Sequence, residues 1–269
     1  MTVSSKVGPD LLEKHVRSSR LLHTAYNVFT RDREVQELWK MSNVNAVSRL
    51  LYNDHGPVHA KIVAGSALEI FDMLVSRGVE PSTLADKTAG SIEEAKLVVM
   101  LGAFLHDIGN SVHRIYHEYV GALLSIDILN RLLPEILGSN HPYLYTIRQE
   151  ILHAIYATSM DAEALTVEAG VVKIGDGTDM AEGRARYPYK RGKSDIHALS
   201  ALSIKKVQLG QGVSRPVKIS VFMDDRAGFF QVEKILLPKI NGTRISKYVE
   251  VEAIVVQRNG KEEKVRITP

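Results

Sequence analysis

The chain has 269 residues, with 34 lysines and arginines against 31 aspartates and glutamates, which gives a formal net charge of +3. This mild charge argues against a general nucleic-acid binder, and a hydrophobic fraction of 45% excludes wholesale disorder. There is no cysteine, so disulfide scaffolds, thiolate metal sites and cysteine nucleophiles are excluded, and any metal must be held by His, Asp or Glu. No apolar run approaches the ~20 residues needed to span a bilayer, and the N-terminus has no apolar signal segment, so we expect a cytoplasmic protein without membrane contact.

Helical periodicity dominates the first two-thirds of the chain. Apolar residues recur at helical spacing over residues 10–159. Gly56-Pro57 favours the start of a helix, and Gly78 and Gly138 favour helix ends. The clearest predicted helices lie near residues 58–77, 92–107, 117–132 and 144–158.

Beyond about residue 195 the pattern changes to that of a small α+β unit. Three segments rich in β-branched residues favour strands, and a segment between the last two has helical spacing. In chain order these are residues 204–209, 217–223, 228–240 (the helix) and 248–257. We therefore expect a mainly α protein, with a helical domain over residues 1–194 and a β-β-α-β domain over residues 195–269.

Histidines and aspartates recur on successive predicted helices. Taken alone, each has an ordinary alternative as a surface residue, a core histidine or a turn residue. Together they supply enough nitrogen and oxygen ligands for a divalent ion. In chain order the motifs are His59 (HAKIVA), His106-Asp107 (LGAFLHDIGN), His117 (HEYVGA), His153 (ILHAI) and Asp176 (VVKIGDGTD).

This ordered set resembles the HD superfamily of metal-dependent phosphohydrolases, whose signature is a first His, an adjacent His-Asp pair and a distant Asp. The likeness covers about residues 45–190, and more loosely it points to archaeal-type members that carry a C-terminal module. The resemblance implies an all-helical HD bundle that hydrolyses a phosphate ester, with a nucleotide as the expected substrate. It gives the catalytic role to His106 and Asp107.

The resemblance also implies two divalent metal ions per chain, with Fe, Mn or Zn expected ahead of Mg or Co. A hydroxide bridging the two ions would attack phosphorus. The first ion would be held by His59, His106, Asp107 and Asp176. The second would share Asp107 and add His117 and His153.

Two ligand assignments stay open. The Gly-Asp-Gly context of Asp176 departs from the family's pattern, which makes Asp179 a rival for that position. His113 lies close enough to compete with His117, although His117 begins the better helix. His55 precedes a Gly-Pro pair and is expected outside the ligand set, where it could orient substrate.

Phosphate recognition needs cations beyond the metal ions. Arg184, Arg186 and Lys190 lie in the basic segment EGRARYPYKRGK shortly after Asp176, and they are predicted to contact the phosphorylated substrate. The alternative is a solvated basic loop that leads to the domain boundary.

The C-terminal unit distantly resembles small ligand-sensing modules of the ACT type, which implies a regulatory or a dimerisation role. Exposed sheet edges in so small a unit favour pairing between subunits, so we expect a homodimer. Two other functions compete with phosphate-ester hydrolysis. One is an HD-type diiron oxygenase, and the other is a non-enzymatic regulator that binds a ligand.

Overall fold

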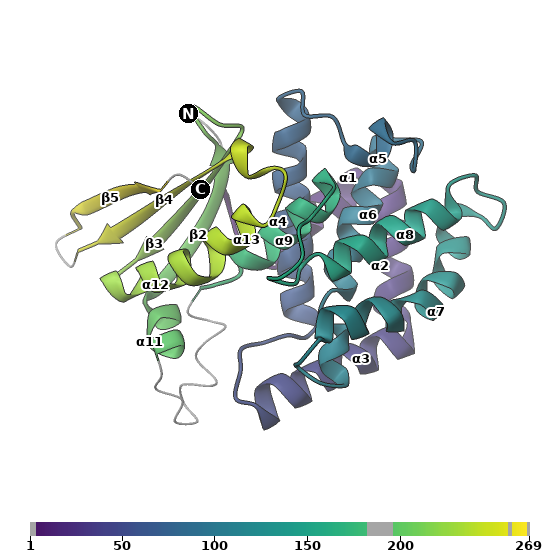
Figure 1. The fold of residues 1–269 in the computed structure, drawn as a ribbon, viewed down its shortest axis with the longest axis horizontal. Coiled ribbons are helices and arrows are strands. Elements are labelled where there is room, and N and C mark those ends of the chain that lie inside the picture. Colours follow the sequence, from purple (N-terminus) through teal and green to yellow (C-terminus); the bar gives the residue numbers. More distant parts are fainter. Residues whose placement is uncertain (1–3, 182–195, 258–259, 268–269) are drawn as a thin grey trace.

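The computed structural model of the protein describes residues 4–181, 196–257 and 260–267. A body of packed helices lies beside a twisted sheet, and short helical segments of the C-terminal unit lie between the two (Figure 1). This confirms the mainly α class with a C-terminal α+β unit. The regulatory or dimerisation role of that unit stays a prediction.

The expected helices are present. Gly78 and Gly138 both have positive φ angles, +82° and +91°, and they lie where α4 and α7 end. Among the described residues, no helix is both long and apolar enough to cross a membrane. The helices of the body are α1 (Asp10–Ser18), α2 (Arg20–Arg31), α3 (Arg33–Asn43), α4 (Pro57–Ser76), α5 (Ser82–Ala85), α6 (Ile92–Leu105), α7 (His117–Leu137), α8 (Leu144–Tyr156) and α9 (Val167–Thr178).

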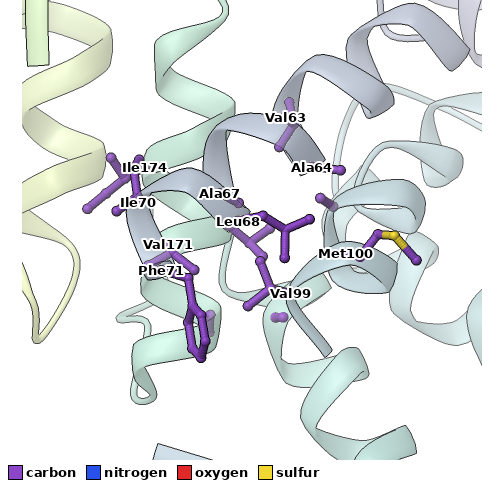
Figure 2. Packing of buried hydrophobic residues seen from close by; sticks show 14 of the residues in the cluster. Val63, Ala64, Ala67, Leu68, Ile70, Phe71, Val99, Met100, Val171 and Ile174 are labelled. Carbon is purple, nitrogen blue, oxygen red and sulfur yellow. The ribbon is translucent and has the colours of Figure 1, made fainter. Parts of the chain in front are cut away.

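Helix α4 runs through the centre of the body and is buried on nearly all sides. It packs against α6 and α9, and Figure 2 shows the apolar side chains at this junction. Leu68 of α4, Val99 of α6 and Val171 of α9 are all fully buried. Each buried side chain of this size stabilises the fold by about 1.5–3 kcal/mol. The core therefore fixes the three helices that carry most of the candidate ligands.

Helix α9 is not among the predicted helices, because three glycines interrupt its apolar pattern. A Cβ atom at Gly175 would lie 3.0 Å from the Val63 carbonyl oxygen, and one at Gly177 would lie 3.1 Å from Lys239 Cδ. A Cβ at Gly170 would lie 3.0 Å from Ile245. The Gly-Asp-Gly sequence is thus not a turn: its glycines let neighbouring elements approach a helix closely.

The sheet has five strands in the order β1-β2-β3-β4-β5. Only β3 and β4 are parallel, with Val217 opposite Val249, and the other neighbours are antiparallel. Helix α11 (Ile196–Ser203) directly precedes β2. A helical crossover of residues 226–241, which includes α12 (Phe229–Gln231) and α13 (Leu237–Asn241), joins β3 to β4. The strands are β1 (Ser5–Lys6), β2 (Ile204–Gln211), β3 (Val217–Met223), β4 (Val249–Val256) and β5 (Glu262–Ile267).

Two strands depart from the expected β-β-α-β unit. β5 is an exposed edge strand whose charged residues hide its periodicity. β1 comes from the N-terminus and pairs with β2, so the sheet is not built from residues 195–269 alone.

Glu69 of α4 ties the N-terminal segment to the helical body. Its carboxylate accepts hydrogen bonds from Ser5 Oγ at 2.7 Å and from Lys14 Nζ at 2.9 Å, and it lies 3.0 Å from His15 Nε2. Burial alone would raise the pKa of Glu69, but the hydrogen bonds from His15, Ser5 and Lys14 outweigh it and lower the pKa to about 2. The ionised carboxylate is therefore part of the folded state.

We expect Glu69→Gln to flatten the acid dependence of stability. The folded pKa lies below the unfolded value, so the stabilisation is complete above about pH 4.5 and is lost as the pH falls toward 2. Between about pH 5 and pH 3, the wild type should lose on the order of 1–3 kcal/mol more unfolding free energy than the variant. Urea unfolding at both pH values measures this, and parallel losses would contradict the assignment.

Candidate metal centre

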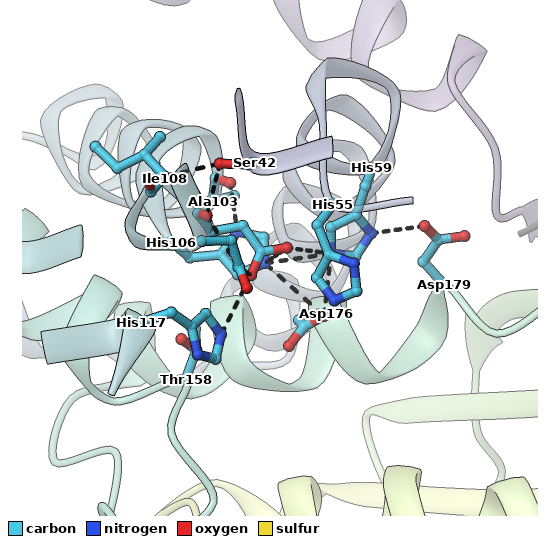
Figure 3. A network of polar contacts seen from close by, with 12 residues as sticks. Ser42, His55, His59, Ala103, His106, Ile108, His117, Thr158, Asp176 and Asp179 are labelled. Carbon is cyan, nitrogen blue, oxygen red and sulfur yellow. Dashed lines mark hydrogen bonds and ion pairs between the residues drawn. The ribbon is translucent and has the colours of Figure 1, made fainter. Parts of the chain in front are cut away.

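The candidate ligands meet at the ends of four helices (Figure 3). His59 lies in the first turn of α4, and His106 and Asp107 follow directly after α6. His117 is the first residue of α7, and Asp176 lies in the last turn of α9. Residues more than a hundred positions apart in sequence are thus brought together by the packing of α4, α6 and α9.

Four ligand atoms converge at the heart of this cluster. His59 Nε2 lies 3.2 Å from His106 Nε2, 3.3 Å from Asp107 Oδ2 and 3.2 Å from Asp176 Oδ1. One ligand atom each from His59, His106 and Asp176 lies within 4.8 Å of the others. Asp107 Oδ2 is buried, and none of the described residues forms a hydrogen bond with it. An orphaned carboxylate oxygen is costly unless a cation neutralises it.

The outer nitrogens of both histidines are committed as donors. His59 Nδ1 donates to Asp179 Oδ2 at 2.7 Å, and His106 Nδ1 donates to the Ala103 carbonyl at 2.8 Å. Because Nδ1 of His106 is the donor, its Nε2 is the nitrogen that can offer a lone pair to an ion, and burial lowers the pKa of this ring. The lone pairs of the four converging atoms repel one another unless a positive charge lies between them. Two imidazole nitrogens and two carboxylate oxygens are a donor set that suits Fe, Mn or Zn. The donor set therefore fits a divalent ion.

Both carboxyl groups of the cluster are ionised. Burial would raise the pKa of Asp107, but the surrounding histidines hold it well below its usual range. Burial also opposes ionisation of Asp176, and there the charge of Lys239 and the hydrogen bond with His59 hold the pKa well below the usual range. The cluster thus offers two formal negative charges to a bound ion.

Asp176 and Asp179 have different positions, which addresses the first open assignment. Asp176 Oδ1 points into the cluster, while Asp179 contacts the far side of the His59 ring. In metal sites a carboxylate in that position orients the histidine and raises its basicity. Asp179 is therefore placed as the hydrogen-bond partner of His59, and Asp176 is the carboxylate at the point where the candidate ligand atoms meet.

Asp179→Asn is expected to weaken metal binding about 10–100-fold, the range seen when a hydrogen-bond partner of a ligating histidine is removed. An amide at this position cannot balance the imidazole N–H as a carboxylate does. Titration of the metal-free protein with Mn²⁺ measures the change, with the exposed Asp127→Asn as the control. An unchanged dissociation constant would show that Asp179 has no influence on His59.

His117 lies at the edge of the cluster. Its Nε2 is 3.4 Å from Asp107 Oδ1 and 3.0 Å from Arg114 Nη1, and its Nδ1 is 2.9 Å from Glu118 Oε2. Burial would lower the pKa of His117, but the contacts with Asp107 and Glu118 raise it. His113, the rival candidate, is exposed and accepts the Ile115 amide.

The structure does not bring His153 to the cluster. Its Nε2 accepts the Leu165 amide at 3.1 Å, and its ring lines a separate pocket with Tyr145 and Thr166. The reason is helical phase: the next residue, Ala154, faces Gly102 of α6, so His153 is turned about 100° away from that contact. The expected role of His153 as a metal ligand is corrected accordingly.

Among the predicted substrate contacts, Arg184, Arg186 and Lys190 lie outside the described residues. The structure instead brings Lys239, which no sequence motif singles out, to the cluster. Its Nζ donates to Asp176 Oδ2 at 2.6 Å. A pocket of about 720 Å³ reaches His59 and Asp179 from the N-terminal segment and β2, and Lys6, Lys14, Lys205 and Lys206 line it.

Comparison of the sequence with known proteins identifies the family to which the chain belongs. Residues 54–181 match the family model described as HD domain. The chain is also 43% identical over 230 residues to the uncharacterized protein MJ1020 of Methanocaldococcus jannaschii, a match that covers 86% of this chain and 88% of that protein. No solved structure matches the chain. Since the matched segment contains the helix ends that bring His59, His106, Asp107 and Asp176 together, the chain belongs to the HD superfamily and carries its phosphohydrolase-type domain.

Proposed function

We propose that the protein is a metal-dependent phosphohydrolase that hydrolyses a phosphate ester, with a nucleotide as the substrate class. The observation that carries this proposal is the convergence of His59, His106, Asp107 and Asp176, where no described residue forms a hydrogen bond with the buried Oδ2 of Asp107. The family supports a metal-dependent hydrolase, and the choice of phosphate ester rests on the charges around the cluster.

A divalent ion bound there supplies a positive charge that polarises a phosphoryl oxygen and promotes deprotonation of water near neutral pH. The protein's own contribution is positioning. Asp179 and the Ala103 carbonyl fix the two imidazole rings, and Asn110 Nδ2 holds Asp107 Oδ1 at 3.0 Å. In the net reaction a bond forms between phosphorus and the oxygen of water, the ester P–O bond breaks, and the proton ends on the leaving alkoxide.

Fixed cations beside the cluster favour an anionic substrate. Arg114 Nη1 lies next to His117, and Lys239 Nζ lies next to Asp176. The pocket that reaches His59 is lined by Asp10, Asp54 and Asp179 as well as by four lysines, of which Lys14 and Lys205 pair with Glu69 and Asp224. The preference for an anion therefore rests on Arg114 and Lys239. Positive groups in this arrangement attract and orient a phosphorylated ligand.

The ligand geometry supports one tightly bound ion. Among the described residues, His117 Nε2 lies 3.4 Å from Asp107 Oδ1, whereas His153 Nε2 accepts the Leu165 amide, so the second ion expected from the sequence lacks one of its two expected histidines. The proposal therefore departs from the two-ion centre expected from the sequence.

The test is phosphate release measured without oxygen. Protein purified anaerobically and loaded with Mn²⁺ or Fe²⁺ is assayed against nucleoside mono- and triphosphates and cyclic nucleotides, with oxygen uptake followed in parallel samples. We expect release, under anaerobic conditions, of inorganic phosphate from a nucleoside monophosphate, of inorganic triphosphate from a nucleoside triphosphate, or of a nucleoside monophosphate from a cyclic nucleotide. Turnover that requires oxygen would favour a diiron oxygenase. A metal-loaded protein that hydrolyses none of these esters would favour a non-enzymatic regulator.

A further inference from the structure

Lys239 reaches the metal centre from the C-terminal unit. It lies in α13, within the crossover between β3 and β4, and α13 packs against α9. Its Nζ donates to Asp176 Oδ2 at 2.6 Å and to the Thr158 carbonyl at 3.2 Å, and its side chain is only 12% exposed. The helical body and the C-terminal unit are therefore in contact at the carboxylate of Asp176.

The approach of this lysine is built into the surrounding backbone. The stem of Lys239 lies against Gly177, the residue after Asp176, where a Cβ atom would come within 3.1 Å of Lys239 Cδ. The segment that follows Thr158 is held in turn by Lys173, whose Nζ donates to the carbonyls of Ser159 and Ala162. The ammonium group is thus placed by fixed contacts on both sides.

Asp176 shares its two oxygens between different partners. Oδ1 faces His59 Nε2 and His106 Nε2, where the ion is expected, and Oδ2 binds Lys239 Nζ. An ammonium group has three N–H donors, and the described residues account for two of them, through Asp176 and Thr158. One donor is left for an oxygen of a ligand bound at the centre.

We propose that Lys239 is a catalytic residue that binds the transferred phosphoryl group, so that the C-terminal unit supplies the positive charge which a second ion provides in two-metal hydrolases. This inference rests on the proposed function. Two-metal sites clamp the attacked phosphate between charges about 3.5–4 Å apart. Here Oδ1 of Asp176 faces the candidate metal site, and Oδ2 of the same carboxylate binds the ammonium group of Lys239. No bond to Lys239 is made or broken, and the bonds that change are those of ester hydrolysis.

Two variants separate charge from positioning. Lys239→Gln removes the charge and keeps a group that can donate toward Asp176, whereas Lys239→Met removes both the charge and the donor. Lys234→Met is the matched control, because Lys234 lies in the same crossover and is exposed. Circular dichroism checks the fold of each variant, and the Gln variant serves if the Met variant does not fold. For each protein we would measure Mn²⁺ bound per chain, the affinity of the Mn²⁺-loaded protein for inorganic phosphate by calorimetry, and hydrolysis.

We expect one Mn²⁺ per chain in the wild type and in all variants. Inorganic phosphate should bind at least about 10-fold more weakly to both Lys239 variants, the loss typical of one charge-assisted hydrogen bond, and the control should match the wild type. Equal phosphate affinities, two Mn²⁺ per wild-type chain, or loss of Mn²⁺ from both Lys239 variants would each overturn the inference. A wild type that binds phosphate through Lys239 but hydrolyses no ester would refute the proposed hydrolysis and leave the phosphate contact standing.

Discussion

Asp107→Asn is expected to abolish metal binding while leaving the fold intact. Asp107 Oδ2 is buried, forms no hydrogen bond with any residue in the described part of the chain, and lies 3.3 Å from His59 Nε2 and 3.4 Å from His106 Nε2. Asparagine keeps the shape and can still accept from Asn110 through its carbonyl oxygen, but it removes the negative charge that the ion needs. Because a ligand is lost and not merely a partner of one, metal affinity should fall by more than about 100-fold. Hydrolysis should fall to background with it.

Stability measurements make this prediction sharper than activity alone. Metal binding to the folded wild type raises its unfolding free energy, by about 2.7 kcal/mol at a free metal concentration 100 times the dissociation constant. The metal-free Asp107→Asn protein carries one buried charge fewer, so it should be at least as stable as the metal-free wild type. Thermal unfolding with and without Mn²⁺ should therefore show a shift in Tm for the wild type and for Asp127→Asn, and none for Asp107→Asn. A full shift in Asp107→Asn would mean that the ion binds elsewhere.

Gly109→Ala should displace the start of α7 and destabilise the whole helical body. A Cβ atom at Gly109 would lie 1.9 Å from the His117 carbonyl oxygen and 2.6 Å from the Gly121 amide nitrogen. Both of these are backbone atoms of α7, so no side chain can rotate away to make room. Overpacking of this kind costs about 3 kcal/mol or more of unfolding free energy, and it moves His117 relative to Asp107.

The matched control is Gly8→Ala, because no atom lies within 4 Å of a Cβ at Gly8 and its φ is not positive. Urea unfolding should place Gly8→Ala close to the wild type and Gly109→Ala far below it. Equal stability of the two alanine variants would rule out the close crossing of residues 108–111 over α7.

The positions of the candidate ligands can be predicted from the sequence where each ligand adjoins a helix with a clear apolar pattern. His59 and the His106-Asp107 pair each adjoin a strongly apolar helix, so local periodicity alone places them at helix ends. Asp176 was harder to place, because the glycines that let α4 and α13 approach α9 also erase its helical pattern. The choice between Asp176 and Asp179 depends on side-chain directions that sequence spacing does not reveal.

The features that the sequence could not predict depend on contacts between distant segments. His153 lies in α8, but its side chain points away from the metal centre. Adjacent residues of a helix differ in direction by about 100°, and it is the next residue, Ala154, that faces α6. Lys239 belongs to an unremarkable stretch, LPKIN, whose position over α9 is fixed only when the crossover between β3 and β4 has formed. β5 is not predicted because four of its six residues are charged, which an exposed edge strand tolerates.

The pairing of β1 with β2 has a consequence for the synthesis of the chain. Ser5 pairs with Leu209, so the first strand waits for a partner that is translated about 200 residues later. At ~5–20 residues per second this delay lasts about 10–40 s, during which the helical body can form and the N-terminal strand has no neighbour. Formation of the sheet then joins Ser5 and Lys6 to a strand that is made about 200 residues later. Such late, long-range pairing is slow, and a bulky tag fused to the N-terminus should interfere with the C-terminal sheet far more than with the helices.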